Sequence, residues 1–98
     1  MSNIRIEWDP NKDRLNQKAH KVSFKEAKTV FWDDDALRIS DTTHSDEEDR
    51  FILLGMSSIM RILTVVHCYR EDDDVIRIIS ARKADRKERE QYTGRKRP

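Results

Sequence analysis

A chain of 98 residues, of which 40% are charged and 36% hydrophobic, is long enough for a single domain with one modest core. No stretch approaches the roughly 18 apolar residues of a membrane span, and the N-terminus has no apolar signal segment, so neither a membrane protein nor a secreted one is expected. The single cysteine, Cys68, lies in an apolar run and has no partner for an internal disulfide, which favours a buried thiol in the cytoplasm.

The net charge of +1 hides an uneven distribution along the chain. Residues 1–49 carry 8 Lys and Arg against 12 Asp and Glu, whereas residues 50–98 carry 12 against 7. A basic half favours contact with a polyanion or with an acidic partner protein. The alternative is a solvated surface that binds nothing in particular and ends in a flexible basic tail over residues 93–98.

The N-terminal segment predicts a strand followed by a helix. Apolar and charged residues alternate over residues 4–8, which is the period of a half-buried strand. Asp9 is a favoured N-cap, and Pro10 suits the first helical position, where its missing N–H costs nothing. We expect a polar surface helix from there to about His20.

A second helix has a fuller start signal. Ser23 and Glu26 have the spacing of a capping box, in which each side chain satisfies an N–H group of the first turn. Apolar residues at spacings of three and four then form one stripe. The acidic run at residues 33–35 ends the helix, because negative charge is unfavourable at a helix C-terminus.

The second half of the chain predicts an antiparallel meander and a last helix. Strands are expected at residues 36–39, 51–56, 61–69 and 75–80, and a helix at residues 84–92. The loop at residues 71–74 is short enough to join the last two strands as a hairpin. The predicted fold is therefore α+β, one domain over residues 1–98, with the order β-α-α-β-β-β-β-α.

Two acidic clusters have the residue types of a metal site but not its spacing. Residues 44–49 hold one histidine and four carboxylates, and residues 72–74 are three aspartates. Neither has the helical histidine spacing of a zinc site or the glycine of a calcium loop. We interpret both as solvated loops, and we expect neither a metal nor a cofactor.

Basic residues on the predicted hairpin favour a different chemistry. Alternation places Arg61, His67 and Tyr69 on one face of their strand, and Arg77 lies on the next strand. Metal-free RNA cleavage needs a proton acceptor, charge stabilisation of the phosphorane and a proton donor. Arginine suits phosphate, and a histidine suits either proton transfer. The alternative is that these side chains only pack or edge the sheet. The hairpin register decides whether Arg77 and His67 share a face.

The pattern of residues resembles the BrnT family of bacterial toxins over about residues 4–92. The first half matches in Ile6-Glu7-Trp8-Asp9, Lys12, Asn16, the block from His20 to Ala27, Val30, Phe31 and His44-Ser45. The second half matches in Arg50, Gly55, Ser57-Ser58, Arg61, Val65-Val66-His67, Tyr69-Arg70, the run from Ile76 to Ala84, Glu88 and Tyr92. The chain departs from the family pattern in two places: the family commonly has Lys-His-Gly where this chain has Ala19-His20-Lys21, and glycine where it has Met60.

The resemblance implies a RelE-like fold and a metal-independent ribonuclease that slows translation and growth. It also implies an antitoxin similar to BrnA, which binds operator DNA through a ribbon-helix-helix domain and joins the toxin in a two-plus-two heterotetramer. The toxin then contacts operator DNA only indirectly, through the antitoxin. The basic face has a second possible role as the surface that the antitoxin covers. The Ala19 difference would weaken toxicity if the family's lysine contacts RNA, and the Met60 difference alters a turn.

We therefore predict a cytoplasmic endoribonuclease toxin. The predicted catalytic residues are Arg61, His67, Arg77, Arg82 and Tyr92, and the predicted RNA-binding residues are Lys12, His20 and Lys83. The arginines would hold the phosphate, His67 would transfer a proton, and Tyr92 would stack on a base or donate a hydrogen bond. The alternative is a non-catalytic toxin homologue that pairs with its antitoxin for operon repression, and the differences at Ala19 and Lys21 favour it.

Overall fold

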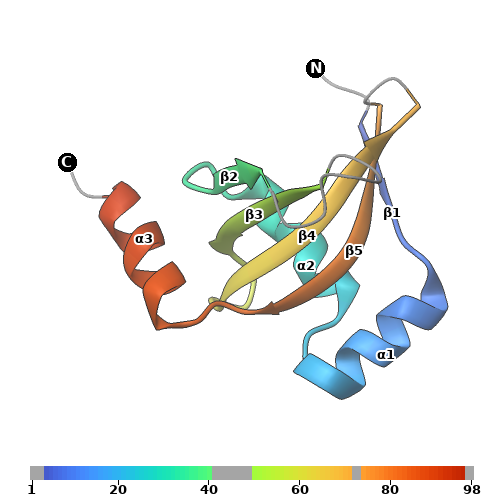
Figure 1. The fold of residues 1–98 in the computed structure, drawn as a ribbon, viewed down its shortest axis with the longest axis horizontal. Helices are drawn as coiled ribbons and strands as arrows, with labels where there is room; N and C mark the ends of the chain where they lie inside the picture. The colour runs from blue at the N-terminus through green and yellow to red at the C-terminus, as the bar shows by residue number, and fades with distance from the viewer. Residues whose placement is uncertain (1–3, 41–49, 72–73, 97–98) are drawn as a thin grey trace.

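A five-stranded sheet with helices on both faces makes up the fold (Figure 1). In the computed structural model the described residues are 4–40, 50–71 and 74–96. The strand order is β1-β5-β4-β3-β2, and β1 is parallel to β5 while every other neighbouring pair is antiparallel. The predicted α+β class and the order of elements are confirmed. No helix in these ranges is long and apolar enough to span a membrane.

The N-terminal elements begin where the sequence predicts. Strand β1 covers Arg5–Glu7, and helix α1 covers Pro10–His20. The Asp9 side chain accepts a hydrogen bond from the Asn11 N–H at 2.8 Å, which satisfies one N–H group of the first turn. Lys21 caps the C-terminus of the helix and has a left-handed φ of 60°, a conformation in which glycine is the usual residue.

The second helix is shorter than predicted. Helix α2 covers Phe24–Thr29, and the chain then tightens into the 3₁₀ turn η1 at Val30–Trp32. The Ser23 hydroxyl accepts from the Glu26 N–H at 3.0 Å, as a capping box requires. The reciprocal contact is not made, because the Glu26 carboxylate binds Arg61 instead.

The four predicted strands of the meander are confirmed with small changes of length. They are β2 (Leu37–Ser40), β3 (Phe51–Met56), β4 (Ile62–Arg70) and β5 (Val75–Lys83). A bulge interrupts the β4–β5 ladder, since Val66 pairs with Ser80 but His67 pairs with Ile78. Gly55 of β3 has no space for a side chain, because an added Cβ would lie 2.8 Å from a Val30 methyl group.

The last helix begins later and ends later than predicted. Helix α3 covers Arg86–Lys96, with Asp85 and Glu88 exchanging a capping pair: the Glu88 N–H donates to the Asp85 carboxylate at 2.8 Å. Residues 93–96, which were expected in a flexible tail, are therefore helical, and residues 97–98 lie outside the described ranges.

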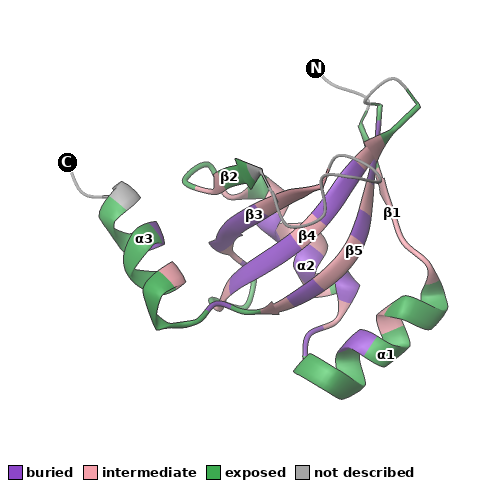
Figure 2. Ribbon diagram, in the orientation of Figure 1, coloured by how far each residue is buried: buried purple, intermediate pink, exposed green. Residues whose placement is uncertain are grey.

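The core has two unequal parts, one on each face of the sheet. The larger part packs α2 and the segment before it on one face, here called the helical face; its buried members include Phe24, Ala27, Leu63, Val65 and Ile78. The smaller part joins Leu54, Ala84 and Tyr92 on the other face, here called the α3 face. Figure 2 shows buried strands between helices α1 and α3, whose outer surfaces are exposed.

Candidate functional site

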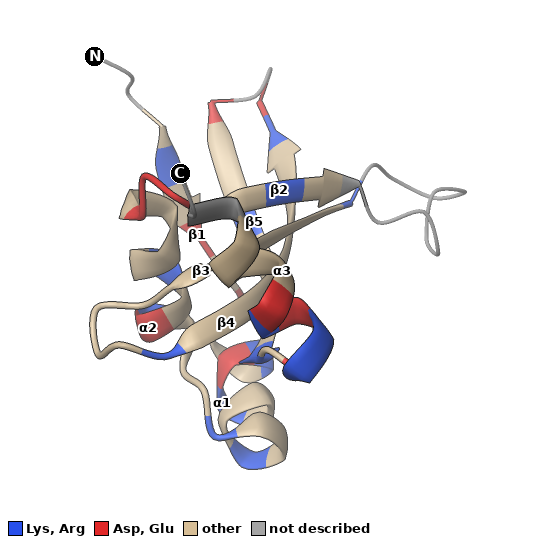
Figure 3. Cartoon of the chain, turned by 90° about the vertical axis from the view of Figure 1, so that its left-hand side faces the viewer, with Lys and Arg blue, Asp and Glu red and all other residues tan. Residues whose placement is uncertain are grey.

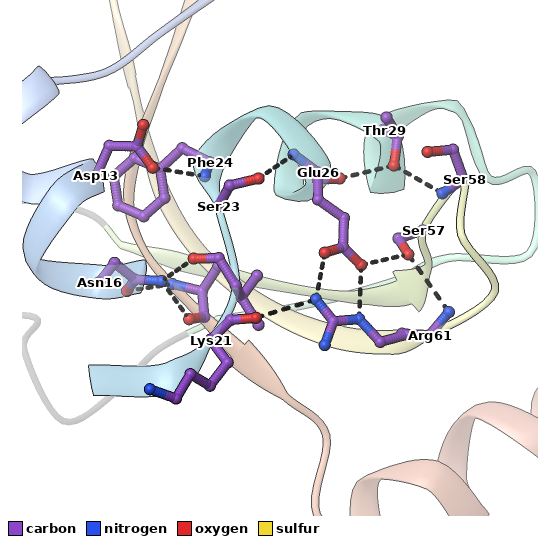
Figure 4. Close-up of polar contacts among 12 residues, drawn as sticks. Asp13, Asn16, Lys21, Ser23, Phe24, Glu26, Thr29, Ser57, Ser58 and Arg61 are labelled. Atoms are coloured by element: carbon purple, nitrogen blue, oxygen red, sulfur yellow. Dashed lines mark hydrogen bonds and ion pairs between the residues drawn. The ribbon is translucent and has the colours of Figure 1, made fainter. Parts of the chain in front are cut away.

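Arg61 lies at the start of β4 and is held by a network from α2 and the α1–α2 turn (Figure 4). Its Nε donates to the Glu26 carboxylate at 3.0 Å, and its Nη2 donates to the same carboxylate and, at 3.1 Å, to the Lys21 carbonyl. The Ser57 hydroxyl also donates to Glu26, at 2.7 Å. The guanidinium of Arg61 is therefore fixed in place with 29% of its side chain exposed.

Hydrogen bonds and nearby charges keep both Glu26 and Arg61 ionised. Burial acts to raise the pKa of Glu26, but hydrogen bonds from Arg61 and Ser57 outweigh it and hold the pKa below its usual value. The charge of Lys83 lowers the pKa of Glu26 further, which places that lysine in the electrostatic reach of the pair. The hydrogen bond to Glu26 raises the pKa of Arg61 in turn.

Arg82 forms a second arginine–glutamate pair on the α3 face. Its Nη1 and Nη2 donate to the two carboxylate oxygens of Glu88 at 2.8 and 3.0 Å, a bidentate arrangement. The Thr64 hydroxyl donates to the same carboxylate at 3.0 Å. These contacts hold the pKa of Glu88 below its usual value, so this carboxylate stays charged at neutral pH.

The two pairs lie at the same end of the sheet. Arg82 pairs with Thr64 in the β4–β5 ladder and Lys83 pairs with Leu63, two residues from Arg61. Side chains alternate along β5, so Arg82 points to the α3 face and Lys83 to the helical face. The exposed His20 precedes Lys21, whose carbonyl binds Arg61. Arg61, Arg82, Lys83, His20 and Lys21 are here called the basic end. Figure 3 shows basic segments of α1, the start of β4 and the first turns of α3 toward that end.

His67 lies at the other end of β4, in an aromatic enclosure. Its ring centroid is 5.0 Å from that of Phe31, 6.1 Å from that of Phe51 and 5.6 Å from that of Tyr69. Its exposure is 0%, and its Nε2 has no hydrogen-bond partner. Burial lowers the pKa of His67 to about 4, so the ring is neutral at physiological pH.

Arg77 does not join the other arginines. It pairs with Cys68 in the ladder, four residues along β4 from Thr64, a separation of about 13 Å at about 3.3 Å per residue. Its Nη1 donates to the Glu7 carboxylate of β1 at 2.6 Å. Because His67 pairs with Ile78, Arg77 and His67 face opposite sides of the sheet, which answers the question that the hairpin register left open.

The remaining predicted residues are also dispersed. Tyr92 of α3 is buried, and its hydroxyl donates to the Asp33 carboxylate at 2.6 Å. Burial, with that contact, raises the pKa of Tyr92 above its usual value, so the hydroxyl keeps its proton. Lys12 is exposed in the first turns of α1, toward the N-terminal end of that helix and away from His20.

Sequence reasoning missed the two glutamates that hold the arginines. Glu88 follows Asp85 at capping-box spacing, a signal of a helix start that the sequence analysis did not use and that does not reveal the contact with Arg82. Residues 44–49 lie outside the described ranges. In residues 4–40, 50–71 and 74–96, no three His, Cys, Asp or Glu side chains group as a metal site.

Comparison with known proteins gives two matches. The family model of BrnT, the ribonuclease toxin of type II toxin–antitoxin systems, matches residues 8–88. The crystal structure of the Brucella abortus ribonuclease toxin BrnT is similar in fold, with a TM-score of 0.66 and 20% sequence identity over 85% of this chain and 99% of the Brucella chain. None of the curated proteins compared with the chain matches it.

Proposed function

The chain belongs to the BrnT family of ribonuclease toxins of type II toxin–antitoxin systems, and on that premise we propose that it cleaves RNA at the basic end without a metal ion. The observation that supports the proposal is that Arg61, Arg82 and Lys83 lie at the same end of the sheet, with Arg61 and Lys83 on the helical face and Arg82 on the α3 face. Cleavage of messenger RNA there would stop translation and growth.

The guanidinium of Arg61 is suited to a phosphate. Glu26 and the Lys21 carbonyl engage Nε and Nη2, and Nη1 makes no hydrogen bond among the described residues. That donor is available to a phosphate oxygen, while Glu26 keeps the side chain from moving. Lys83, on the same face, supplies a second positive charge for the phosphorane.

The proton transfers need a group other than His67, which is buried and uncharged. His20 is the exposed imidazole of the described residues, one position from the carbonyl that Arg61 binds. We assign it the removal of the 2′-hydroxyl proton. The 2′-oxygen then attacks the phosphorus, the P–O5′ bond breaks, and the 5′-oxygen takes a proton from water or from Lys83. The products are a 2′,3′-cyclic phosphate and a 5′-hydroxyl end.

An RNA cleavage assay in excess EDTA tests this function. We expect the purified chain to cleave single-stranded RNA at an unchanged rate after chelation and to leave a 2′,3′-cyclic phosphate. Cleavage that stops on chelation and returns with Mg²⁺ or Mn²⁺ would contradict the proposal and direct attention to the acidic residues 44–49 and 72–74.

A type II toxin has an antitoxin as its partner, and we assign that role here to a protein similar to BrnA. Two copies of each would form the complex, and the antitoxin would hold the operator DNA. Inducing the chain alone should arrest growth and deplete messenger RNA, and expression of the antitoxin should restore both.

A non-catalytic pairing module is the second candidate. It is favoured by the carboxylates of Glu26 and Glu88, which already neutralise Arg61 and Arg82. Normal growth of cells that contain verified folded protein, together with formation of the antitoxin complex, would establish this candidate over the ribonuclease.

A further inference from the structure

An apolar pocket lies beside α2, outside the basic end. Its volume is about 640 Å³, and its lining includes Lys25, Lys28, Trp32, Met56 and Ser58. Trp32 of η1 is 64% exposed, although tryptophan is usually the most costly side chain to leave in water. An exposed apolar pocket with a polar rim marks an interaction site more often than a plain surface.

The turn between β3 and β4 adds two more exposed apolar side chains. Ile59 is 61% exposed and Met60 is 76% exposed, and both directly follow Ser58 of the pocket. The Ser58 N–H donates to the Thr29 hydroxyl at 2.9 Å, which fixes this turn against α2. The turn that carries these two exposed side chains is therefore fixed next to the pocket, whose lining includes Ser57 and Ser58 but neither Ile59 nor Met60.

Met60 has a backbone conformation that does not suit it. Its φ is 68°, in the left-handed region, where a side chain costs about 1–2 kcal/mol relative to glycine. An exposed methionine gives the isolated fold nothing in return for this strain. Left-handed strain also occurs at Lys21 and Glu71, so it does not identify a function alone, but an exposed methionine beside an apolar pocket suits an adaptable protein contact.

The charge at the rim indicates what kind of partner fits. Lys25 and Lys28 line the pocket, and among the described residues neither forms an ion pair with a carboxylate. The carboxylate that lines it, Asp33, faces the fold, where its Oδ2 accepts from the Met56 N–H and the Tyr92 hydroxyl. Among the charged residues that line the pocket, those left to meet a partner are therefore the two lysines.

We propose that this surface, made of Lys25, Lys28, Trp32, Ile59 and Met60, is where the antitoxin docks. The occupant is an amphipathic antitoxin segment with a bulky apolar side chain in the pocket and aspartate or glutamate opposite the two lysines. The inference depends on the antitoxin of the proposed function and names its binding surface. An RNA base would stack on Trp32, but the pocket offers it lysines at the rim and no guanidinium.

The position of the pocket also explains how docking would stop cleavage. Ser57 lines the pocket, and its hydroxyl donates to the Glu26 carboxylate that holds Arg61. The side chains of Ser57 and Glu26 therefore connect the pocket to Arg61 of the basic end. Part of the antitoxin would cover the entry of RNA to Arg61.

Binding of the full chain to its antitoxin, measured by calorimetry, tests the surface. Trp32→Ser should weaken binding about 30-fold or more, the scale of a hot-spot residue. Lys28→Glu should slow association, and the loss should shrink at high salt. The matched controls are Leu15→Ser, also an exposed apolar residue at 59%, and Lys18→Glu on α1; both should bind as the unmodified chain does.

Tryptophan fluorescence tests the same surface without a substitution in it. The chain has two tryptophans, and a Trp8→Phe variant reports on Trp32 alone. Its emission should shift to the blue when the antitoxin binds, because Trp32 leaves water. An unshifted emission together with full binding by Trp32→Ser would overturn the proposal.

Three further outcomes would also overturn it. If Trp32→Ser keeps antitoxin binding but loses RNA binding, the pocket is a nucleotide site. If it keeps antitoxin binding but abolishes a dimer of the chain in solution, the surface joins two copies. If Leu15→Ser weakens binding as much as Trp32→Ser, the effect is not specific to the pocket. If the unmodified chain does not cleave RNA but Trp32→Ser weakens antitoxin binding as expected, the result counts against the proposed activity and not against the docking surface.

Discussion

Arg61 and His67 lie on the same side of β4, one at each end, but their side chains have opposite environments. At the start of the strand, Arg61 is partly exposed and fixed by Glu26. Six residues on, His67 is fully buried among aromatic rings. Side-chain alternation predicts which face a residue lies on, but the helices decide whether that face is open, and η1 covers His67 with Phe31.

The difference is the reason that the proposed cleavage is placed at one end of the strand. A group that transfers protons must reach solvent or substrate, and a group that holds a phosphate must be charged. Arg61 meets the second condition, whereas His67 in this conformation meets neither. On the proposed function, the aromatic end would be a packing element and the basic end would hold the substrate.

Arg61→Ala should have the largest effect on cleavage. Loss of a preorganised donor to the phosphorane is expected to lower kcat/KM by about 10²–10³. Glu26→Gln is the matched control, because it weakens the same ion pair but leaves the guanidinium. If both variants lower the rate only as far as they lower the folded fraction in a thermal melt, Arg61 has a structural role alone.

Variants of Arg82 and Arg77 compare the two ends of the α3 face. Arg82→Ala should lower kcat/KM by about 10² because Arg82 shares the basic end with Arg61. Arg77→Ala removes a similar ion pair about 13 Å away, and cleavage should change less than about threefold. Steady-state rates on one RNA substrate make the comparison. Equal losses in the two variants would place substrate along the whole strand.

His67→Phe should reduce the pH dependence of the free energy of unfolding. The pKa of His67 is lowered from 6.5 to about 4 by burial, so the unfolded chain binds a proton first as the pH falls. Stability is therefore complete above pH 6.5 and decreases down to about pH 4, by about 3 kcal/mol in total. The phenylalanine variant should lose this dependence between pH 6.5 and 4.5, above the range in which Glu26 and Glu88 protonate. Urea unfolding at several pH values measures it, and an unchanged slope would contradict the burial.

Lys21→Gly should have the smallest effect, and in the stabilising direction. Lys21 has a φ of 60°, and glycine removes about 1–2 kcal/mol of left-handed strain, which its greater freedom in the unfolded chain offsets by about 0.5–1 kcal/mol. The carbonyl that binds Arg61 remains. Adding Ala19→Lys restores the pattern common in the family and should raise cleavage if a lysine there contacts RNA. A fall in both stability and cleavage would show that the Lys21 side chain is needed.

Local signals in the sequence predicted the elements well. Asp9 with Pro10 and Ser23 with Glu26 marked helix starts that the structure confirms, because capping depends on residues close in the chain. The same reasoning does not reach β1, whose parallel pairing with β5 joins residues 70 positions apart. Pairing of that kind is decided by packing of the whole sheet.

The site was less predictable than the fold. Arg61 and Arg82 were chosen for their charge, but Glu26 was assigned only to a helix cap and Glu88 was noted only as a match to the family pattern. The β4–β5 register decides that Arg77 faces away from His67, and no residue pattern in the hairpin fixes a register with a bulge. The left-handed φ at Lys21 and Met60 was visible only as two departures from a family pattern.

The most direct test of the two-end account is the cleavage rate of His67→Phe beside that of Arg61→Ala, in excess EDTA at pH 7. We expect His67→Phe to cleave within about threefold of the unmodified chain and Arg61→Ala to be slower by about 10²–10³. A loss of about 10² or more in His67→Phe, with folded protein verified, would contradict the account, because His67 would then have to leave its aromatic enclosure and take part in proton transfer.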